Sequence, residues 1–195
     1  MGPPCALWVL LALLEALTGV TPPRKYWPTT VQIMQGFKVD KFQGEWFVLG
    51  LAGSTHSKAD RLLLSPFTAT FEQNKKQQLE VTYAMMRGQR CVTWSYVLIP
   101  TTEPGRFSVE NSRELGTDTE EMWVHDTDYS TFALMSSRRR SAQGSILRVH
   151  LLFRLWAIQT EMLEKFLCVL KAQGLSEVNI VFPDIPDWAP YRRPC

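Results

Sequence analysis

The strongest constraint on the fold is a series of short β-rich runs, each separated from the next by residues that favour turns. β-Branched and aromatic residues favour strands, whereas Gly, Pro, Asn and Asp mark the breaks between them. Because the breaks are of hairpin size, the runs predict antiparallel strands connected in up-and-down order. The eight expected strands are residues 42–53, 66–72, 78–87, 91–100, 105–111, 120–126, 129–137 and 145–154.

The number of strands narrows the architecture to two kinds. Eight antiparallel strands can close into a barrel that holds one small ligand, but they also fit a two-sheet sandwich. One amphipathic helix is expected after the strands, over residues 161–173. There Met162, Phe166 and Leu170 recur at helical spacing, and Gly174 ends the helix.

The N-terminal segment reads as a signal peptide over residues 1–19. Its apolar stretch, 8–14, is too short to span a bilayer, and small residues follow it. The alternative is a buried N-terminal helix, which Pro22 and Pro23 would interrupt. We therefore expect a secreted, extracellular protein without a transmembrane segment, with an N-terminal arm over 20–36 and one domain over 37–195.

Charge and motif content exclude several classes of function. A net charge of +2 is too small to indicate nucleic-acid binding. The basic run Arg138 to Arg140 is interpreted as a solvated hairpin end or as a receptor-binding surface. The three histidines lack metal-ligand spacing, and no Ser-His-Asp spacing or Gly-rich phosphate loop is present. We expect no metal, no cofactor and no enzymatic activity.

Three cysteines remain once the signal peptide is removed, namely Cys91, Cys168 and Cys195. Export favours a disulfide, and the odd number leaves one thiol over. Cys168 shares the polar face of the predicted helix, so we expect it to be that thiol and Cys91–Cys195 to be the bridge. Cys91–Cys168 remains the alternative. The protein is expected to be monomeric unless Cys168 forms a covalent dimer.

Three short sequence motifs occur in a fixed order along the chain and are typical of one protein family. They are Gly44-Glu45-Trp46, Thr127-Asp128-Tyr129 and Leu151-Leu152-Phe153-Arg154. With these blocks the chain resembles the lipocalin family, and most of all its epididymal-specific members. The resemblance favours the barrel over the sandwich. It implies an all-β fold, an eight-stranded antiparallel up-and-down calycin barrel with one C-terminal α-helix packed outside.

The family blocks also imply roles for their residues. Gly44 is expected to allow a tight turn into the first strand, and Trp46 to plug the closed end of the barrel with Arg154 stacked on its ring. Phe153 stands where the family usually has Gly, which puts the packing near the barrel floor in question. The family disulfide joins the fourth strand to the C-terminal tail, which agrees with Cys91–Cys195.

Side chains alternate between the two faces of a strand, so the resemblance also predicts which ones face the cavity. With Trp46 inward, Val48 and Gly50 are expected to follow. The walls are then aromatic and rich in sulfur, with cations near the open end. The predicted ligand-binding residues are Tyr83, Met85, Trp94, Tyr96, Met135, Ser137, Arg139, Arg148 and His150.

This set predicts a carrier of a small hydrophobic or amphipathic ligand, such as retinoic acid or a fatty acid, with its carboxylate near Arg139 or Arg148. The alternative for these two arginines is a solvated rim. A siderophore-binding lipocalin would need a third cation, where Tyr96 stands. A receptor-directed lipocalin remains open. The enzyme of the family uses a barrel cysteine near the second strand, and residues 59–72 contain none.

Overall fold

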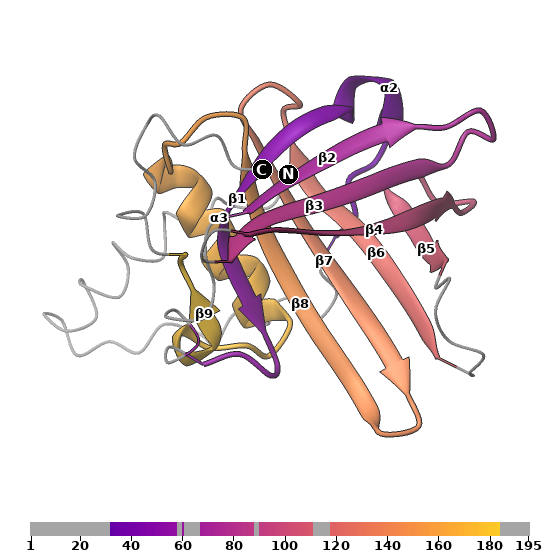
Figure 1. Ribbon diagram of the computed structural model, residues 1–195. Coiled ribbons are helices and arrows are strands. Elements are labelled where there is room, and N and C mark those ends of the chain that lie inside the picture. The colour runs from indigo at the N-terminus through magenta and orange to yellow at the C-terminus, as the bar shows by residue number, and fades with distance from the viewer. Residues whose placement is uncertain (1–31, 58–59, 61–66, 88–89, 111–117, 184–195) are drawn as a thin grey trace, which may run out of the picture.

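A single antiparallel sheet closes on itself to form the body of the molecule (Figure 1). The computed structural model describes residues 32–57, 60, 67–87, 90–110 and 118–183. β1 pairs with β8 on one side and with β2 on the other, which closes the ring and excludes a sandwich. The strands are β1 (Gly44–Gly53), β2 (Phe67–Gln73), β3 (Leu79–Arg87), β4 (Arg90–Pro100), β5 (Arg106–Glu110), β6 (Thr119–Thr127), β7 (Phe132–Ser141) and β8 (Gly144–Phe153).

The predicted eight-stranded barrel is therefore confirmed, with three local differences. The segment before β1 forms a short helix, α2 (Val39–Phe42), which ends at the residue where the sequence predicted the strand to start. β7 begins three residues later than expected and runs on to Ser141, so the basic run Arg138 to Arg140 lies within a strand. A short ninth strand, β9 (Ile180–Val181), pairs with β1 on the side of the C-terminal segment.

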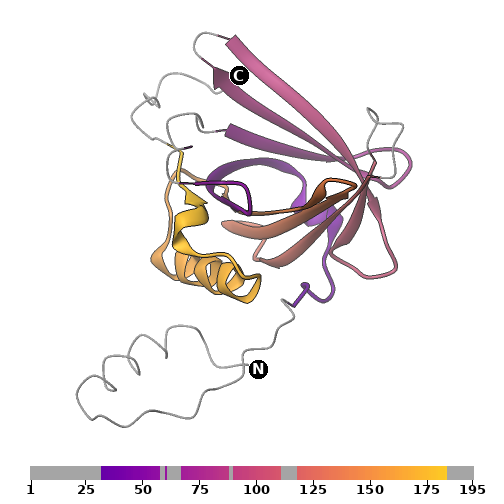
Figure 2. The ribbon, with the colours of Figure 1, turned by 90° about the horizontal axis from the view of Figure 1, so that it is seen from below.

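The helix α3 (Thr160–Ala172) packs against the outside of the barrel, as predicted (Figure 2). Its buried side chains Met162, Phe166 and Leu170 join a hydrophobic cluster with outward-facing residues of β7 and β8. Phe153 belongs to this cluster and is 2% exposed. The large ring at the family's usual glycine position therefore fills the helix interface and does not disturb the barrel floor. A short turn of helix, η2 (Glu177–Asn179), leads into β9.

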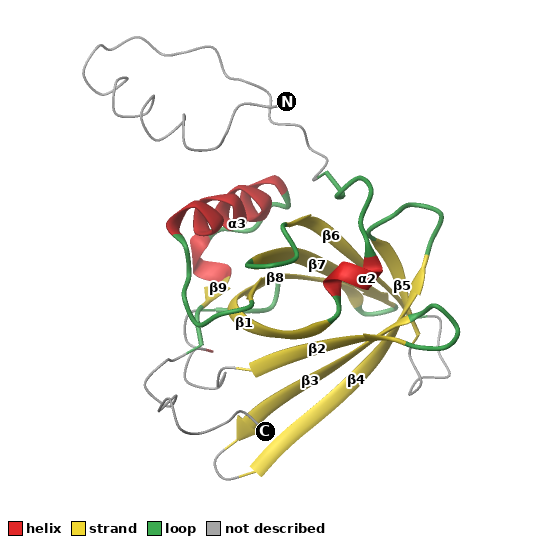
Figure 3. Ribbon diagram, turned by 90° about the horizontal axis from the view of Figure 1, so that it is seen from above, coloured by secondary structure: helices red, strands yellow, loops and turns green. Residues whose placement is uncertain are grey.

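The short helix α2 lies over one end of the barrel (Figure 3). Aromatic rings of the inner hydrophobic cluster close this end. Trp46 is fully buried and stacks on Phe42 at 5.1 Å between ring centroids. Its indole Nε1 donates to the Phe42 carbonyl at 2.9 Å. Because α2 places Phe42 one turn before Trp46, the local helix completes the plug that a continuous strand could not form.

Arg154, the residue that follows the last barrel strand, holds this plug in place. Its guanidinium lies 3.7 Å from the centroid of the Trp46 ring. It also donates to the carbonyls of Phe42, Gln43, Glu45 and Tyr129 at 2.7–3.3 Å. The expected cation–π contact is present, and the backbone acceptors add charge-assisted hydrogen bonds. Gly44 has φ +95°, and a Cβ there would lie 3.1 Å from an Arg154 nitrogen, so both conformation and space require glycine.

The second family block forms the tight turn between β6 and β7. The Asp128 carboxylate accepts from the backbone nitrogens of Ser130, Thr131 and Phe132 and from the Thr131 hydroxyl. Desolvation raises the pKa of Asp128, but these hydrogen bonds outweigh it and lower the pKa below its ordinary value. Thr127 Oγ1 donates to the Phe132 carbonyl at 2.6 Å, and Tyr129 adopts φ +66°. The turn therefore delays the start of β7 to Phe132.

A bulge in β1 overturns one predicted orientation. The pairing with β8 shifts between Val48, which faces Leu152, and Gly50, which faces Leu151. The extra residue reverses the alternation, so Leu51 turns inward beside His150. The predicted inward position of Gly50 is wrong. A Cβ at Gly50 would point to the outside of the barrel, where it would lie 3.2 Å from Leu151 and 3.4 Å from Phe182.

The cysteines also depart from expectation. Neither Cys91 nor Cys168 is a free thiol in the structure. The predicted leftover thiol at Cys168 is therefore wrong, and the covalent dimer loses its basis. Cys195 lies outside the described residues, as does the predicted signal peptide, 1–19. No helix in the described part of the chain is long and apolar enough to cross a membrane.

The role of Arg154 yields a stability prediction. Arg154→Met should lower the free energy of unfolding by about 3 kcal/mol, because the ring contact and four hydrogen bonds to backbone carbonyls are lost together. Arg140→Met removes the same charge from an exposed strand end and should change stability by less than about 0.5 kcal/mol. Urea unfolding of both variants measures the difference, and equal losses would contradict the role of Arg154.

Candidate ligand cavity

The interior of the barrel is not filled throughout. Above the aromatic plug lies a cavity of about 230 Å³. Residues from β1, β2, β3, β4, β5, β6, β7 and β8 all contribute to its wall, so its shape depends on closure of the whole sheet. The lining consists of Leu51, His56, Phe67, Tyr83, Met85, Trp94, Tyr96, Val109, Glu120, Met122, Ser137, Arg148 and His150.

Most of the predicted ligand-binding residues lie in this wall. Two do not. Met135 lies deeper, 2% exposed within the inner cluster, and so fills the barrel floor. Arg139 shares the inward face of β7 but donates to Asp118 at 2.9 Å. The predicted residues that line the cavity are Tyr83, Met85, Trp94, Tyr96, Ser137, Arg148 and His150.

Several cavity-lining residues were not predicted. The sequence pattern could have identified some of them but not others. Leu51 faces inward only because of the bulge, which no local pattern announced. His56 enters from the loop after β1, where strand alternation does not apply. Glu120 and Met122 could have been found, because they alternate with the buried Val124 along β6. Phe67 and Val109 complete the missed set.

One side of the cavity is an aromatic wall. Tyr83 and Trp94, paired across β3 and β4, stack at 5.4 Å with their ring planes 16° apart. Phe67 lies 5.9 Å from Trp94, and Tyr96 lies 6.1 Å from Tyr83. Burial, together with Tyr96 and Glu120, raises the pKa of Tyr83, so its hydroxyl stays neutral. These rings give an apolar guest a broad surface to pack against.

The opposite side of the cavity is polar. Arg148 on β8 lies across from Ser137 on β7, and its guanidinium is 3.8 Å from the carboxylate of Glu120 on β6. Glu120 is only 8% exposed. His56 lies against Gly53, and its buried Nδ1 has no hydrogen-bond partner among the described residues. Together with His150, these side chains form the polar group of the cavity, namely His56, Glu120, Ser137, Arg148 and His150. The polar group can receive the polar end of a guest whose apolar part contacts the aromatic rings.

The two cavity histidines, His56 and His150, are both neutral at physiological pH. Burial, with the positive charge of Arg148 and with His56 nearby, lowers the pKa of His150 to about 3. Burial and Arg148 also lower the pKa of His56, against a smaller opposing effect of Asp60. The formal charges in the described lining are then those of Arg148 and Glu120, which balance.

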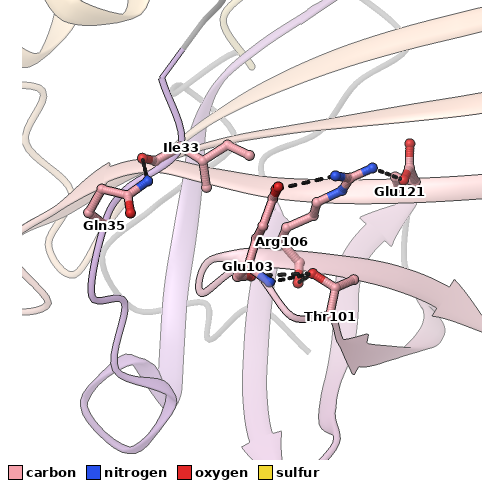
Figure 4. A network of polar contacts seen from close by, with 6 residues as sticks. All are labelled: Ile33, Gln35, Thr101, Glu103, Arg106 and Glu121. Carbon is pink, nitrogen blue, oxygen red and sulfur yellow. Dashed lines mark hydrogen bonds and ion pairs between the residues drawn. The ribbon is translucent and has the colours of Figure 1, made fainter.

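The neighbouring acid on β6 belongs to a separate network outside the barrel (Figure 4). Glu121 accepts from Arg106 at 2.7 Å, and Arg106 also reaches Glu103 at 3.2 Å. These contacts join β6 to the turn before β5, and both carboxylates raise the pKa of Arg106. Adjacent glutamates therefore serve opposite faces of one strand.

Comparison with known proteins agrees with this geometry. The Lipocalin / cytosolic fatty-acid binding protein family matches residues 43–187, which span the whole barrel and α3. The chain is a lipocalin. Proteins of this family typically bind small hydrophobic molecules, and most are binding or carrier proteins.

Individual relatives are similar over most of their length. The chain is 51% identical to human epididymal-specific lipocalin-12 over 162 residues, which cover 83% of this chain and 84% of that protein. It is 32% identical to pig prostaglandin-H2 D-isomerase, covering 93% and 94%. The solution structure of lipocalin 12 from rat epididymis superposes with a TM-score of 0.76 at 43% identity, covering 83% of this chain and 95% of that one.

The low pKa of His150 predicts a specific dependence of stability on pH. Between pH 6.5 and about 3, the unfolded chain binds a proton at this position that the folded protein does not. Lowering the pH from 7 to 5 should therefore destabilise the wild type through His150 by up to about 2 kcal/mol. In urea unfolding over the same pH range, the His150→Asn variant should therefore lose about 2 kcal/mol less free energy of unfolding than the wild type. Equal losses in both proteins would contradict a neutral, buried His150.

Proposed function

We propose that this lipocalin is an extracellular carrier that binds a small apolar or amphipathic molecule, of the retinoid or fatty-acid class, in the barrel cavity. The observation that carries the proposal is the division of the cavity into an aromatic wall and a polar group. The stacked Tyr83 and Trp94 suit an extended apolar body, and Arg148 with its neighbours suits one polar end.

The cavity volume supports a guest that is partly accommodated by movement of the wall. About 230 Å³ lies below the roughly 300–1,000 Å³ usual for ligand pockets. Met85 and Met122 lie in the wall, and methionine side chains repack readily around flexible guests. An elongated hydrocarbon therefore fits this cavity better than a bulky, rigid guest.

Two rival functions receive less support from the lining. A siderophore-type cargo would favour several cations, yet Arg148 lies beside Glu120 and Arg139 beside Asp118. A prostaglandin-synthase type of activity would use a cavity cysteine, and no described lining residue is a cysteine. Transport of a mostly apolar molecule fits the balanced charge of the wall.

The proposal includes export, with residues 1–19 as the signal peptide, 20–36 as the arm and 37–195 as the folded domain. A disulfide between Cys91 and Cys195 would then tie the C-terminal tail to the start of β4. The alternative, Cys91–Cys168, is the pairing that accounts for both described cysteines, because neither of them is a free thiol. The likeness to lipocalins, which are generally secreted, supports export.

A binding experiment tests the carrier function. Trp94 lies in the aromatic wall, so retinol, retinoic acid or hexadecanoic acid should quench tryptophan fluorescence at micromolar concentrations, and Trp94→Phe should lose most of the quenching. Trp123→Phe, on the outward face of β6, is the matched control.

A cavity-filling variant tests the location of the guest. Val109→Trp should weaken binding about tenfold or more, because the larger side chain occupies the cavity. Val97→Trp makes the same change outside, where Val97 pairs with Glu80 and Glu110, and should bind normally. Absence of quenching by all three probes, or equal binding by both Trp variants, would refute a guest in the barrel.

Expression of the full chain in a secreting cell tests export and the disulfide. We expect a mature protein that begins at about residue 20. Peptide mapping without reduction should yield a linked pair containing Cys91 and Cys195. A pair containing Cys91 and Cys168 would establish the alternative, and retention of residues 1–19 would refute the signal peptide.

A further inference from the structure

The cavity contains an acid whose position has a consequence for ligand choice. Glu120 lies on the inward face of β6, across from Arg139 on β7, and is 8% exposed. Its carboxylate reaches diagonally past Ser137 towards Arg148 on β8, at 3.8 Å. A side chain of this protein therefore already provides the carboxylate that a fatty acid or retinoic acid would bring to Arg148.

The distance between these two groups leaves room for a ligand atom to interact with both. At 3.8 Å the pair is an ion pair but is longer than a hydrogen bond. A hydroxyl group can accept from the guanidinium and donate to the carboxylate at once. A ligand carboxylate can only accept, and it would add a second negative charge beside Glu120 in a partly desolvated site.

No other cation in the described lining compensates for that second charge. Both cavity histidines are kept neutral by burial and by Arg148. Arg139, near the mouth of the cavity, lies 2.9 Å from Asp118. A carboxylate would therefore share one guanidinium with Glu120.

We infer that Glu120 is a specificity-determining residue, which shifts the preference of the cavity away from a carboxylate and towards a hydroxyl end group. The inference rests on the proposed carrier function and specifies which end of the ligand the polar group recognises. It assigns Arg148 and Glu120 together as a donor and acceptor pair for an alcohol.

The test compares two ligands that differ only in their end group. Retinol and retinoic acid are titrated against the wild-type protein and the Glu120→Gln variant, with tryptophan quenching as the readout. The ratio of the affinity for the acid to that for the alcohol should rise about tenfold in Glu120→Gln, because the competing charge is removed. Glu121→Gln removes the same charge from the outer face of β6 and should leave the ratio unchanged.

A reciprocal variant gives the opposite change. Arg148→Gln leaves Glu120 without its cation, so the ratio of the affinity for retinoic acid to that for retinol should fall below the wild-type ratio. If the ratio is the same in Glu120→Gln as in the wild type while both ligands still bind, the role of Glu120 is refuted and the carrier function stands. If neither ligand binds to any of these proteins, the carrier function and this inference are both refuted.

Discussion

The structure depends on β1, because this one strand closes the sheet. Its first half pairs with β2 and its second half with β8, and the bulge between Val48 and Gly50 lies where the pairing with β2 ends. The bulge lets a single strand serve three environments. Trp46 lies in the floor, Leu51 in the cavity wall, and Leu49 and Ala52 in the helix interface.

The closed end illustrates how a polar side chain can complete an apolar core. Arg154 directly follows β8, more than one hundred residues after Trp46, yet it covers the indole ring and binds carbonyls on both sides of Gly44. Phe42 ends α2 and Gln43 lies between that helix and β1, so their carbonyls lie outside the sheet, whereas Glu45 belongs to β1. The guanidinium provides the donors that the backbone lacks, and its flat face replaces a hydrophobic lid.

The cavity above this floor combines two kinds of surface that are each stable without a guest. The rings of Phe67, Tyr83 and Trp94 pack on one another, and the charges of Arg148 and Glu120 offset one another. Because the charged groups of the wall already have partners within the protein, a guest gains affinity mainly from apolar contact. Its polar end decides selectivity, since a buried polar group that is badly matched is costly.

The sequence by itself determined the local features of this protein. Eight strands, one helix, the Gly44 turn and the inward positions of Tyr83, Trp94 and His150 followed from alternation, turn residues and family blocks, all of which act over a few residues. The tertiary structure decided the reversal at Leu51, the helix at Val39–Phe42 and the partners of Arg148 and Arg139. These depend on where a bulge falls and on which residues of distant strands lie opposite, and strand register is set by closure of the whole barrel rather than by neighbouring residues.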